Sequence, residues 1–322
     1  MSEASGSGRR AGAASRALAA ACAVVLAGCA SPSPAEPRQP TTAASYVDVS
    51  FRPTGIDAAV AGSPAREFVL AFLLAREGRC EPVWGSERAL SDPALLADIA
   101  AVRAAGGSVT AASGGATGEY LENSCASPAD LARAYTAALD ATGADRLDVD
   151  VEAIVPTDLV ADALARVQDD RGTAITLTLP VADAERGLES AYLPLVRALT
   201  ARDVEITVNA MLMNFPVSGT WTDSLLAAAD TVGEQLTAFG LSRDRLGLTL
   251  MAGRNDTGVT TTVEDVRAVR HYAEAHHLAF VALWSLARDN GACPGRAEAA
   301  ATCSGLDQAP YDFIRALTEE AA

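Results

Sequence analysis

The sequence contains no lysine, so all 25 of its basic residues are arginines. Without lysine, the protein has no side chain for Schiff-base catalysis and no Walker-type phosphate-binding loop. Histidine is almost absent too: His271, His276 and His277 fall in one segment, and no GxSxG, HExxH or CxxC motif accompanies them. A serine triad or a zinc site would need more histidines or one of these motifs. His276 and His277 are expected to be solvated residues at a helix end. We therefore expect no metal and no cofactor.

Positive charge is scarce relative to negative charge. The formal net charge is −16 and the isoelectric point is near 4.6, which argues against a surface built to bind nucleic acid or anionic lipid. The 322 residues are 49% hydrophobic, enough for one large domain or two modest ones. A neutral or cationic ligand is therefore the simpler expectation.

Long hydrophobic runs are also missing. The apolar run at 17–27 follows three arginines and has about half the length of a membrane-spanning helix, which is typical of an export signal. It ends in LAGC at Cys29, which resembles the lipobox of bacterial lipoproteins; an ordinary cleaved signal is the alternative. We expect a lipoprotein signal peptide at 1–29 and a tether rich in Pro, Ser and Thr at 30–45. The protein is then an exported lipoprotein of the cell envelope, associated with the membrane only through this lipid anchor, or secreted if Cys29 is not lipidated.

Four further cysteines follow the tether, namely Cys80, Cys125, Cys293 and Cys303. An even number in an exported chain predicts two disulfide bonds, and the spacings do not fit a zinc cluster. Three pairings are open. We favour Cys80 with Cys125 and Cys293 with Cys303, because the second bond closes a short loop rich in Gly and Ala.

In the rest of the chain, eight short apolar runs alternate with segments of helical periodicity. Eight strands alternating with helices over about 270 residues are the pattern of an α/β (β/α)8 TIM barrel, which usually has about 250. A doubly wound open sheet is the competitor, but no GxGxxG motif follows the first run. We expect a single-domain barrel at 46–318 that acts as a monomer. The expected strands are 46–51, 68–74, 108–112, 146–152, 174–179, 204–211, 245–252 and 278–284.

The fourth run, DRLDVDVE, places a carboxylate at every second residue from Asp148 to Glu152. Because side chains alternate across a strand, Asp148, Asp150 and Glu152 share one face and three aliphatic residues share the other. In a barrel the acids point inward, and each one lies closer to the C-terminal end of the strands, where the active sites of such enzymes lie. Central parallel strands have no solvated face, so these carboxylates must be paired, neutralised or in use. Their mutual repulsion raises at least one pKa, and Glu152, nearest the mouth, is the natural general acid.

Two acids on one strand cannot flank a glycosidic bond from opposite sides, as the usual pair of glycosidase carboxyls does. A glycosidase built on this strand needs a nucleophile from elsewhere, and the known solution is a substrate whose own 2-acetamido group attacks. Asp150 would then orient the acetamide while Glu152 protonates the leaving oxygen.

The pattern resembles the DxxDxDxE signature of glycoside hydrolase family 18, the chitinase and endo-β-N-acetylglucosaminidase family. It falls at the fourth expected strand, where that family carries it. The resemblance extends over nearly all of residues 46–318. Other segments similar to the bacterial chitinase branch are YVDVSF, FVLAFLLA, TLTLPV, VNAMLM, LGLTLMAGRND and the ending from ALWSLARDN onward.

The resemblance implies a retaining, substrate-assisted hydrolysis of β-1,4-linked N-acetylglucosamine glycans, with chitin oligosaccharides as the expected partner; peptidoglycan and N-glycan cores stay open. It implies Glu152 as the acid and then the base. Asp150 would stabilise the oxazolinium intermediate, and Asp148 would share charge and a proton with Asp150. Asp145 is the first residue of the motif.

Substrate-binding residues are implied on later strands. Trp284, at the end of the eighth run, would be the floor on which the sugar stacks, since an aromatic face suits the C–H face of a sugar. Met213 and Asn214 would contact the substrate from the end of the sixth run. Trp84 lies in an expected loop near Cys80, where it is expected only to pack.

The sequence departs from the family at two places. Where this branch usually has SxGG, the chain has Ala112 before Ser113, and where the family has an Asp-Tyr pair it has Asn214 and Phe215. Loss of that acid is expected to lower the pKa of Glu152, and Asn214→Asp is expected to raise the rate of a working but detuned hydrolase. Two other hypotheses stay open: a glycan-binding protein without turnover, and a structural envelope lipoprotein, which would leave the acidic strand unexplained.

Overall fold

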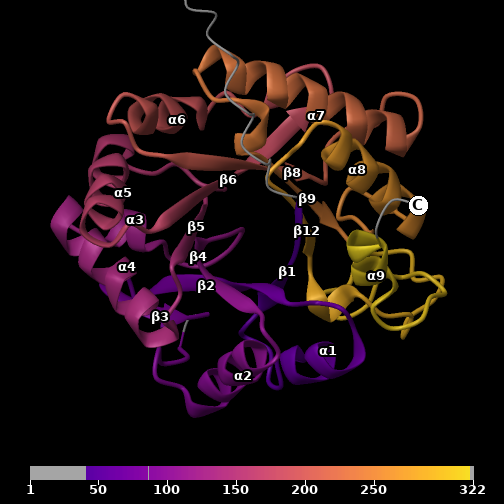
Figure 1. Cartoon of the computed structure of the whole chain (residues 1–322), viewed down its shortest axis with the longest axis horizontal. Coiled ribbons are helices and arrows are strands. Elements are labelled where there is room, and N and C mark those ends of the chain that lie inside the picture. Colours follow the sequence, from indigo (N-terminus) through magenta and orange to yellow (C-terminus); the bar gives the residue numbers. More distant parts are fainter. Residues whose placement is uncertain (1–40, 86, 320–322) are drawn as a thin grey trace, which may run out of the picture. The chain divides into compact units, whose positions relative to one another are not determined.

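The computed structural model describes residues 41–85 and 87–319 of the chain. Eight parallel strands form a closed barrel, and helices surround it as an outer ring (Figure 1). The barrel closes because β1 pairs with β12 on one side and with β2 on the other. The prediction of a single-domain (β/α)8 TIM barrel is confirmed. The barrel strands are β1 (Thr42–Asp48), β2 (Glu67–Arg76), β4 (Ser108–Gly114), β5 (Arg146–Asp150), β6 (Ala174–Asp183), β8 (Ile206–Leu212), β9 (Leu246–Met251) and β12 (Phe280–Trp284).

Most helices of the outer ring coincide with segments of helical periodicity in the sequence, whereas those at 56–62 and 312–318 are not expected from it. The helices of the ring are α1 (Ile56–Gly62), α2 (Pro93–Ala104), α4 (Pro128–Thr142), α5 (Thr157–Arg171), α6 (Leu193–Thr200), α7 (Trp221–Ala238), α8 (Val263–Ala275) and α9 (Asp312–Thr318). Ser127, Thr220 and Thr262 cap α4, α7 and α8 by accepting backbone N–H bonds, as N-cap residues do. Within the described part of the chain, no helix has the length and apolar character needed to span a membrane.

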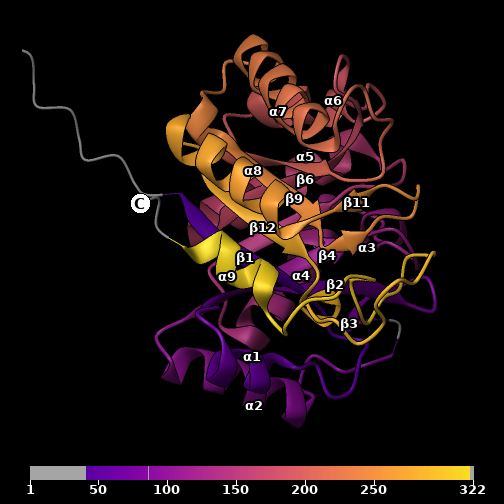
Figure 2. The ribbon, with the colours of Figure 1, turned by 90° about the vertical axis from the view of Figure 1, so that its right-hand side faces the viewer.

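Within residues 41–85 and 87–319, three short antiparallel strand pairs lie outside the barrel, and the sequence pattern does not predict them. β3 (Arg79–Trp84) folds back onto β2, β7 (Gly187–Leu188) folds back onto β6, and β10 (Gly253–Arg254) pairs with β11 (Thr260–Thr261). Trp84, expected in a loop, lies in β3 and is fully buried. Figure 2 shows β3, β11 and the short helix α3 (Leu121–Ser124) at the end of the barrel away from the C-terminus.

Both predicted disulfide bonds are present. Cys80 bonds Cys125, with their Cα atoms 4.7 Å apart, and Cys293 bonds Cys303, with their Cα atoms 6.0 Å apart. The first bond ties β3 to the segment between α3 and α4. The second closes a loop in the segment between β12 and α9. The pairing favoured from the sequence is therefore confirmed.

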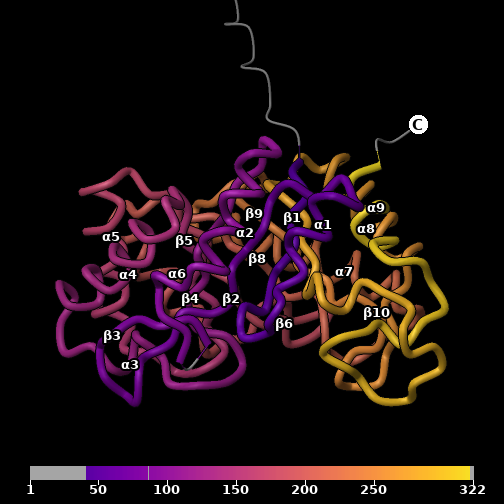
Figure 3. The backbone as a smooth tube through the Cα atoms, turned by 90° about the horizontal axis from the view of Figure 1, so that it is seen from below, coloured from indigo at the N-terminus to yellow at the C-terminus, as the bar shows by residue number. Residues whose placement is uncertain are grey.

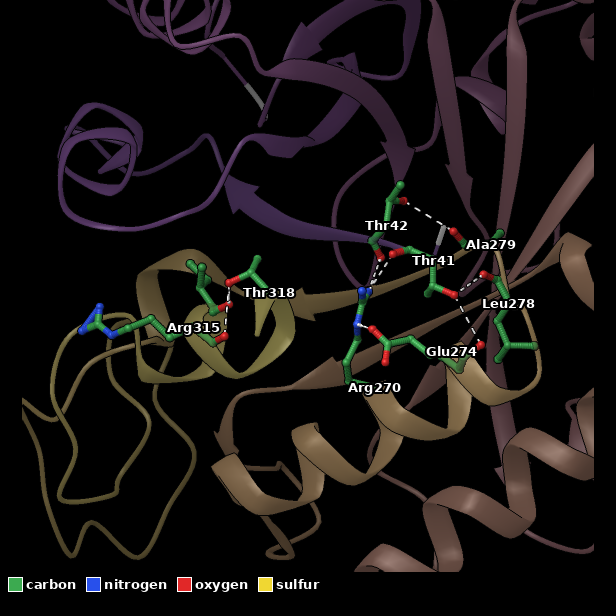
Figure 4. A network of polar contacts seen from close by, with 10 residues as sticks. Thr41, Thr42, Arg270, Glu274, Leu278, Ala279, Arg315 and Thr318 are labelled. Atoms are coloured by element: carbon green, nitrogen blue, oxygen red, sulfur yellow. Dashed lines mark hydrogen bonds and ion pairs between the residues drawn. The ribbon is translucent and has the colours of Figure 1, made fainter. Parts of the chain in front are cut away.

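Polar contacts hold the start of β1 at the N-terminal end of the barrel (Figure 4). The hydroxyl of Thr41 donates to the carbonyl oxygen of Leu278 at 2.8 Å. Arg270 donates to the carbonyl oxygen of Thr41 at 2.8 Å and pairs with Glu274 at 2.7 Å. Figure 3 shows β1 close to α9, so the two ends of the described chain meet on this side.

These contacts correct one predicted boundary. Residues 42–45, expected to end the tether, belong to β1, where they pair with β12 and complete the barrel. At its other end β1 stops at Asp48, so Phe51 lies outside the strand expected to contain it. The predicted signal peptide, Cys29 and the rest of the tether lie outside the described residues.

Two hydrophobic layers flank the barrel strands. The larger core lies between strands and helices and contains Leu147, Val149 and Val151, the three aliphatic residues of the acidic strand. The smaller cluster lies inside the barrel. Because most of its members are small, the barrel interior keeps room for polar groups and for a cleft. Its buried members are Tyr46, Val69, Ala71, Ala112 and Ala282.

Candidate active site

A cleft with a volume of about 120 Å³ opens at the C-terminal end of the barrel strands. Five predicted site residues line it: Asp150, Glu152, Met213, Asn214 and Trp284. They belong to three segments far apart in the sequence, at the ends of β5, β8 and β12, and the closure of the barrel brings them together. The lining is completed by Tyr46, Phe72, Ala116, Thr178, Met211, Thr249, Met251 and Asp256.

The acidic strand points its carboxylates inward, as the alternation predicts. Asp148 and Asp150 are 1% and 4% exposed. β5 ends at Asp150, two residues earlier than expected, but Val151 still donates its N–H to the carbonyl oxygen of Thr178 at 2.9 Å. Glu152 therefore lies just beyond the end of β5, and its side chain lines the cleft. Asp145 precedes β5 at the opposite end, is exposed, and takes no part in the cleft.

A chain of hydrogen bonds leads to Asp148. Thr249 donates to the amide oxygen of Asn209 at 2.9 Å, and the amide nitrogen of Asn209 donates to the hydroxyls of Tyr46 and Thr178, both at 3.0 Å. These hydroxyls donate to the two carboxyl oxygens of Asp148 at 2.8 and 2.6 Å. Because every donor is directed toward it, the network suits a charged Asp148, which only accepts. Burial raises the pKa of Asp148 to about 6, while the bonds from Thr178 and Tyr46 act in the opposite direction.

Asp150, two residues further along the acidic strand, has no comparable set of hydrogen bonds. Its Oδ1 atom is buried and has no hydrogen-bond partner among the described residues. Its pKa lies well above the ordinary value, first because of burial and then because of the negative charges of Glu152 and Asp148. This agrees with the raised pKa expected from the acidic ladder. The hydrogen-bond network therefore favours charge on Asp148, whereas burial and two negative neighbours favour the protonated form of Asp150.

Glu152 has a second acidic neighbour that the sequence does not reveal. Burial raises the pKa of Glu152, and the charge of Asp256 raises it further. Asp256 lies between β10 and β11 and forms two hydrogen bonds with Asn214, each 2.9 Å long: Asn214 Nδ2 donates to the Asp256 carboxylate, and the Asp256 N–H donates to Asn214 Oδ1. The lowering of the Glu152 pKa expected from the missing acid at 214 is therefore opposed by an acid at 256.

The remaining departures from the family lie behind the cleft. Phe215 is buried and packs on Trp221, with ring centroids 4.7 Å apart. Ala112 belongs to the apolar cluster inside the barrel. The hydroxyl of Ser113 points away from the cleft and donates to the buried Glu122 at 2.7 Å. None of these three residues is among those that line the cleft.

Trp284 forms an aromatic wall of the cleft. Phe72 stacks on it with ring centroids 5.6 Å apart and planes at 22°, and Tyr46 meets it edge-on at 6.0 Å. Both Phe72 and Trp284 adjoin cis peptide bonds, Ala71–Phe72 and Trp284–Ser285. The wall continues into a patch of thioether side chains that pack on Trp284, namely Met211, Met213 and Met251.

Among the residues in and behind the cleft that the sequence does not single out are Tyr46, Phe72, Asp256 and Tyr120. Tyr46, Phe72 and Asp256 lie within segments that carry the family resemblance, which is the only signal the sequence offers for them. Tyr120 lies in a stretch without a motif, yet its hydroxyl accepts the N–H of Glu152 at 3.0 Å. Its role is visible only once the loop after β4 is folded against β5.

Comparison with known proteins gives consistent matches, although no protein-family model matches the chain. The chain is similar to the probable bifunctional chitinase/lysozyme of Escherichia coli (strain K12), with 28% identity over 309 residues that cover 84% of this chain and 33% of that protein. It is also similar to endochitinase 11 of Metarhizium anisopliae, with 28% identity over 256 residues that cover 69% of this chain and 47% of that protein. The chain thus spans less than half the length of these curated relatives.

The solved structures agree with this. The catalytic domain of the hyperthermophilic chitinase from Pyrococcus furiosus matches with a TM-score of 0.79 and 27% identity, over 88% of this chain and 98% of that one. The match therefore covers a complete catalytic domain. The barrel, the DxxDxDxE strand and these similarities together support the assignment of the chain to the chitinase-like glycosidases of glycoside hydrolase family 18.

Proposed function

We propose that this protein hydrolyses β-1,4-linked N-acetylglucosamine glycans, with chitin oligosaccharides as substrates, by a retaining, substrate-assisted mechanism. The observation that carries the proposal is the buried Oδ1 of Asp150, which has no hydrogen-bond partner among the described residues. A buried acceptor without a donor is costly. The N–H of a 2-acetamido group supplies the missing donor, whereas a sugar hydroxyl at C2 brings no carbonyl oxygen that could act as the nucleophile.

In the first step, the acetamido oxygen attacks the anomeric carbon while Glu152 transfers its proton to the leaving glycosidic oxygen. The bond from the anomeric carbon to that oxygen breaks, and an oxazolinium ring forms. Burial and the charge of Asp256 favour the protonated form of Glu152 that this step needs. Asp150 accepts a hydrogen bond from the acetamido N–H. Asp148, whose pKa is about 6, takes the shared proton, so that negative charge develops on Asp150 beside the cationic ring.

In the second step, the Glu152 carboxylate removes a proton from water. The water attacks the anomeric carbon from the side that the leaving group has vacated, the oxazolinium ring opens, and the product keeps the β configuration. Trp284 offers an apolar face to the sugar ring. Met213 and Asn214 line the wall beside it and are proposed to contact the substrate.

We extend the proposal to location. The LAGC sequence at Cys29 after an apolar run supports export as a lipoprotein of the cell envelope, with secretion as the alternative if Cys29 is not lipidated. The two disulfide bonds support an oxidising compartment. Labelling of Cys29 by a fatty-acid analogue in a bacterial host, compared with Cys29→Ala, tests the anchor.

A second candidate function, glycan binding without turnover, is favoured by Asn214, where the resemblance leads one to expect an acid. Its amide nitrogen is engaged by Asp256 at 2.9 Å, so the groups around the cleaved bond differ from the family pattern. The two candidates predict the same ligand and differ in turnover.

The test is hydrolysis of 4-nitrophenyl di-N-acetylchitobioside by the wild type and by Glu152→Gln. Glu264→Gln, at a side chain that is 80% exposed on α8, is the matched control. We expect turnover by the wild type and the control, and a loss of about 10²- to 10⁴-fold in Glu152→Gln, the usual contribution of a general acid. Calorimetric binding of tri-N-acetylchitotriose without any turnover would favour the second candidate. Absence of both turnover and binding would contradict both.

A further inference from the structure

Tyr120 joins two backbone segments at the foot of Glu152. Its hydroxyl donates to the carbonyl oxygen of Gly115 at 2.6 Å and accepts the N–H of Glu152 at 3.0 Å. The same hydroxyl lies 3.3 Å from the carbonyl oxygen of Asp150. One side chain thus contacts the backbone of both acids at the end of the ladder. Tyr120 is only 5% exposed and is not among the residues that line the cleft.

The loop after β4 is built to meet β5 at this point. The N–H of Gly115 donates to the carbonyl oxygen of Asp150 at 3.0 Å. Gly114 has a φ of 98°, and a Cβ atom on it would lie 2.0 Å from that same oxygen. Only glycine permits this approach, because any side chain would push the loop away from β5. The loop after β4 therefore holds the backbone of Asp150 and Glu152 from one side, through the hydrogen bonds of Gly115 and of the Tyr120 hydroxyl.

The segment that carries Tyr120 is itself held firmly. Tyr120 immediately precedes α3, and the disulfide bond of Cys125 to Cys80 fixes the other end of that helix. Glu122, within α3, is fully buried and accepts hydrogen bonds from Ser113 at 2.7 Å and from Tyr135 at 2.6 Å. These supports come from β3, β4 and α4, so the ring of Tyr120 has little freedom to move.

We propose that Tyr120 is a positioning residue for the reaction: it fixes the backbone at Glu152 so that the carboxyl group meets the leaving oxygen. This inference rests on the proposed function. Tyr120 does not touch the substrate, since its hydroxyl is engaged by backbone groups behind the cleft. Burial raises the pKa of the hydroxyl above its ordinary value, so it stays protonated and keeps donating to Gly115. Loss of the hydroxyl leaves the Glu152 N–H without its acceptor and allows the carboxyl to drift from the line of proton transfer.

The leaving group of the substrate gives a direct test. In the phenyl glycoside of di-N-acetylchitobiose the leaving group is poor and needs a proton from Glu152. In the 2,4-dinitrophenyl glycoside the leaving group departs as a stable anion and needs no proton. We expect Tyr120→Phe to lower kcat/KM for the phenyl glycoside about tenfold or more, since small displacements of a catalytic group have large effects. The loss for the dinitrophenyl glycoside should stay below about threefold. Glu152→Gln should show the same selectivity in a stronger form.

Tyr272→Phe is the matched control, because it removes a hydroxyl that bonds Asp230 on the outer ring at 2.6 Å. The ratio of the two glycosides is measured on one preparation, so partial unfolding of a variant cancels. Equal losses on both glycosides, or no loss on either, would overturn the positioning role while leaving the proposed function intact. A wild type inactive on both glycosides would overturn the proposed function, and the inference with it.

Discussion

Asn214 and Asp256 form a reciprocal pair at the rim of the cleft. The amide nitrogen of Asn214 donates to the Asp256 carboxylate, and the Asp256 N–H donates to the amide oxygen of Asn214, both at 2.9 Å. Asn214 adopts a left-handed backbone conformation with φ of 60°, which Asn tolerates better than most residues. The pair keeps one negative charge near Glu152, but moves it from the end of β8 to the segment between β10 and β11.

This pair changes the result expected for Asn214→Asp. The single substitution sets two carboxylates at hydrogen-bonding distance, so we now expect it to lower kcat/KM about tenfold or more through repulsion and displacement of the rim. The double variant Asn214→Asp with Asp256→Asn restores one donor and one acceptor and should recover most of the loss. The check is a double-mutant cycle in kcat/KM. Additive effects of the two substitutions would show that the contact is not coupled to the reaction.

Asp256→Asn alone tests the electrostatic role of Asp256. Its charge is the second cause of the raised pKa of Glu152, so its removal lowers that pKa. Because Glu152 must carry a proton to act as the acid, the alkaline limb of the kcat/KM profile should move to lower pH. Asp244→Asn, which removes one charge at an exposed position outside the cleft, should leave the limb in place. A limb that stays fixed or moves upward in Asp256→Asn would rule out this electrostatic effect.

The two disulfide bonds should contribute unequally to stability. They span 45 and 10 residues, and loop-closure entropy then gives about 4 kcal/mol for Cys80–Cys125 and about 3 kcal/mol for Cys293–Cys303. Denaturant unfolding of the two Cys→Ser pair variants measures both values. We expect the larger loss for the first pair, and its removal should also lower activity, because it holds the segment that carries Tyr120. A larger stability loss for the second pair would contradict the entropic account.

Asp289 should make stability depend on pH. It is 1% exposed and accepts the N–H groups of Phe313 and Ile314 at the start of α9. Burial raises its pKa from 3.8 to about 6 despite these bonds. Between these values the folded protein holds a proton that the unfolded chain has released, so stability should rise as pH falls from about 6 to about 4.

The shift of Asp289 corresponds to at most about 3 kcal/mol. Thermal unfolding between pH 7 and pH 4 should therefore show a smaller pH dependence in Asp289→Asn than in the wild type, with Asp244→Asn as the control for net charge. Identical slopes in Asp289→Asn and the wild type would show that Asp289 does not titrate in this range. Asp148, whose pKa is raised to about 6, and Asp150, Glu152 and Glu122, whose pKa values are also raised, contribute to the slope that remains.

Local patterns in the sequence are sufficient to predict the barrel and the orientation of the acidic strand. Alternation within DRLDVDVE predicts that Asp148 and Asp150 face inward while Leu147 and Val149 face the helices, because side-chain direction on a strand depends only on position. Eight apolar runs separated by helical segments leave few arrangements other than a closed parallel barrel. Such patterns do not predict the antiparallel strands outside the barrel. The strand β3 is short and contains a proline, and its pairing with β2 depends on a two-residue turn at Glu77 and Gly78.

The surroundings of the acids depend on contacts between distant segments, which local patterns do not contain. Tyr46 and Asp148 are 102 positions apart and meet only because β1 closes the barrel. Asp256 reaches Asn214 across 42 positions. The resemblance to glycoside hydrolase family 18 directs attention to the segments that hold Tyr46 and Asp256, but it does not predict that an acid at 256 offsets the one missing at 214.

The central claim, that the acetamido group of the substrate acts as nucleophile while Glu152 serves as acid and base, is tested most directly by the configuration of the first product. Proton NMR can follow hydrolysis of tri-N-acetylchitotriose by the wild type, with spectra recorded before mutarotation sets in. The account predicts that the new reducing end appears first as the β anomer and drifts toward the α,β equilibrium later. Initial release of the α anomer would contradict it, since inversion requires direct attack by water on the opposite face of the sugar.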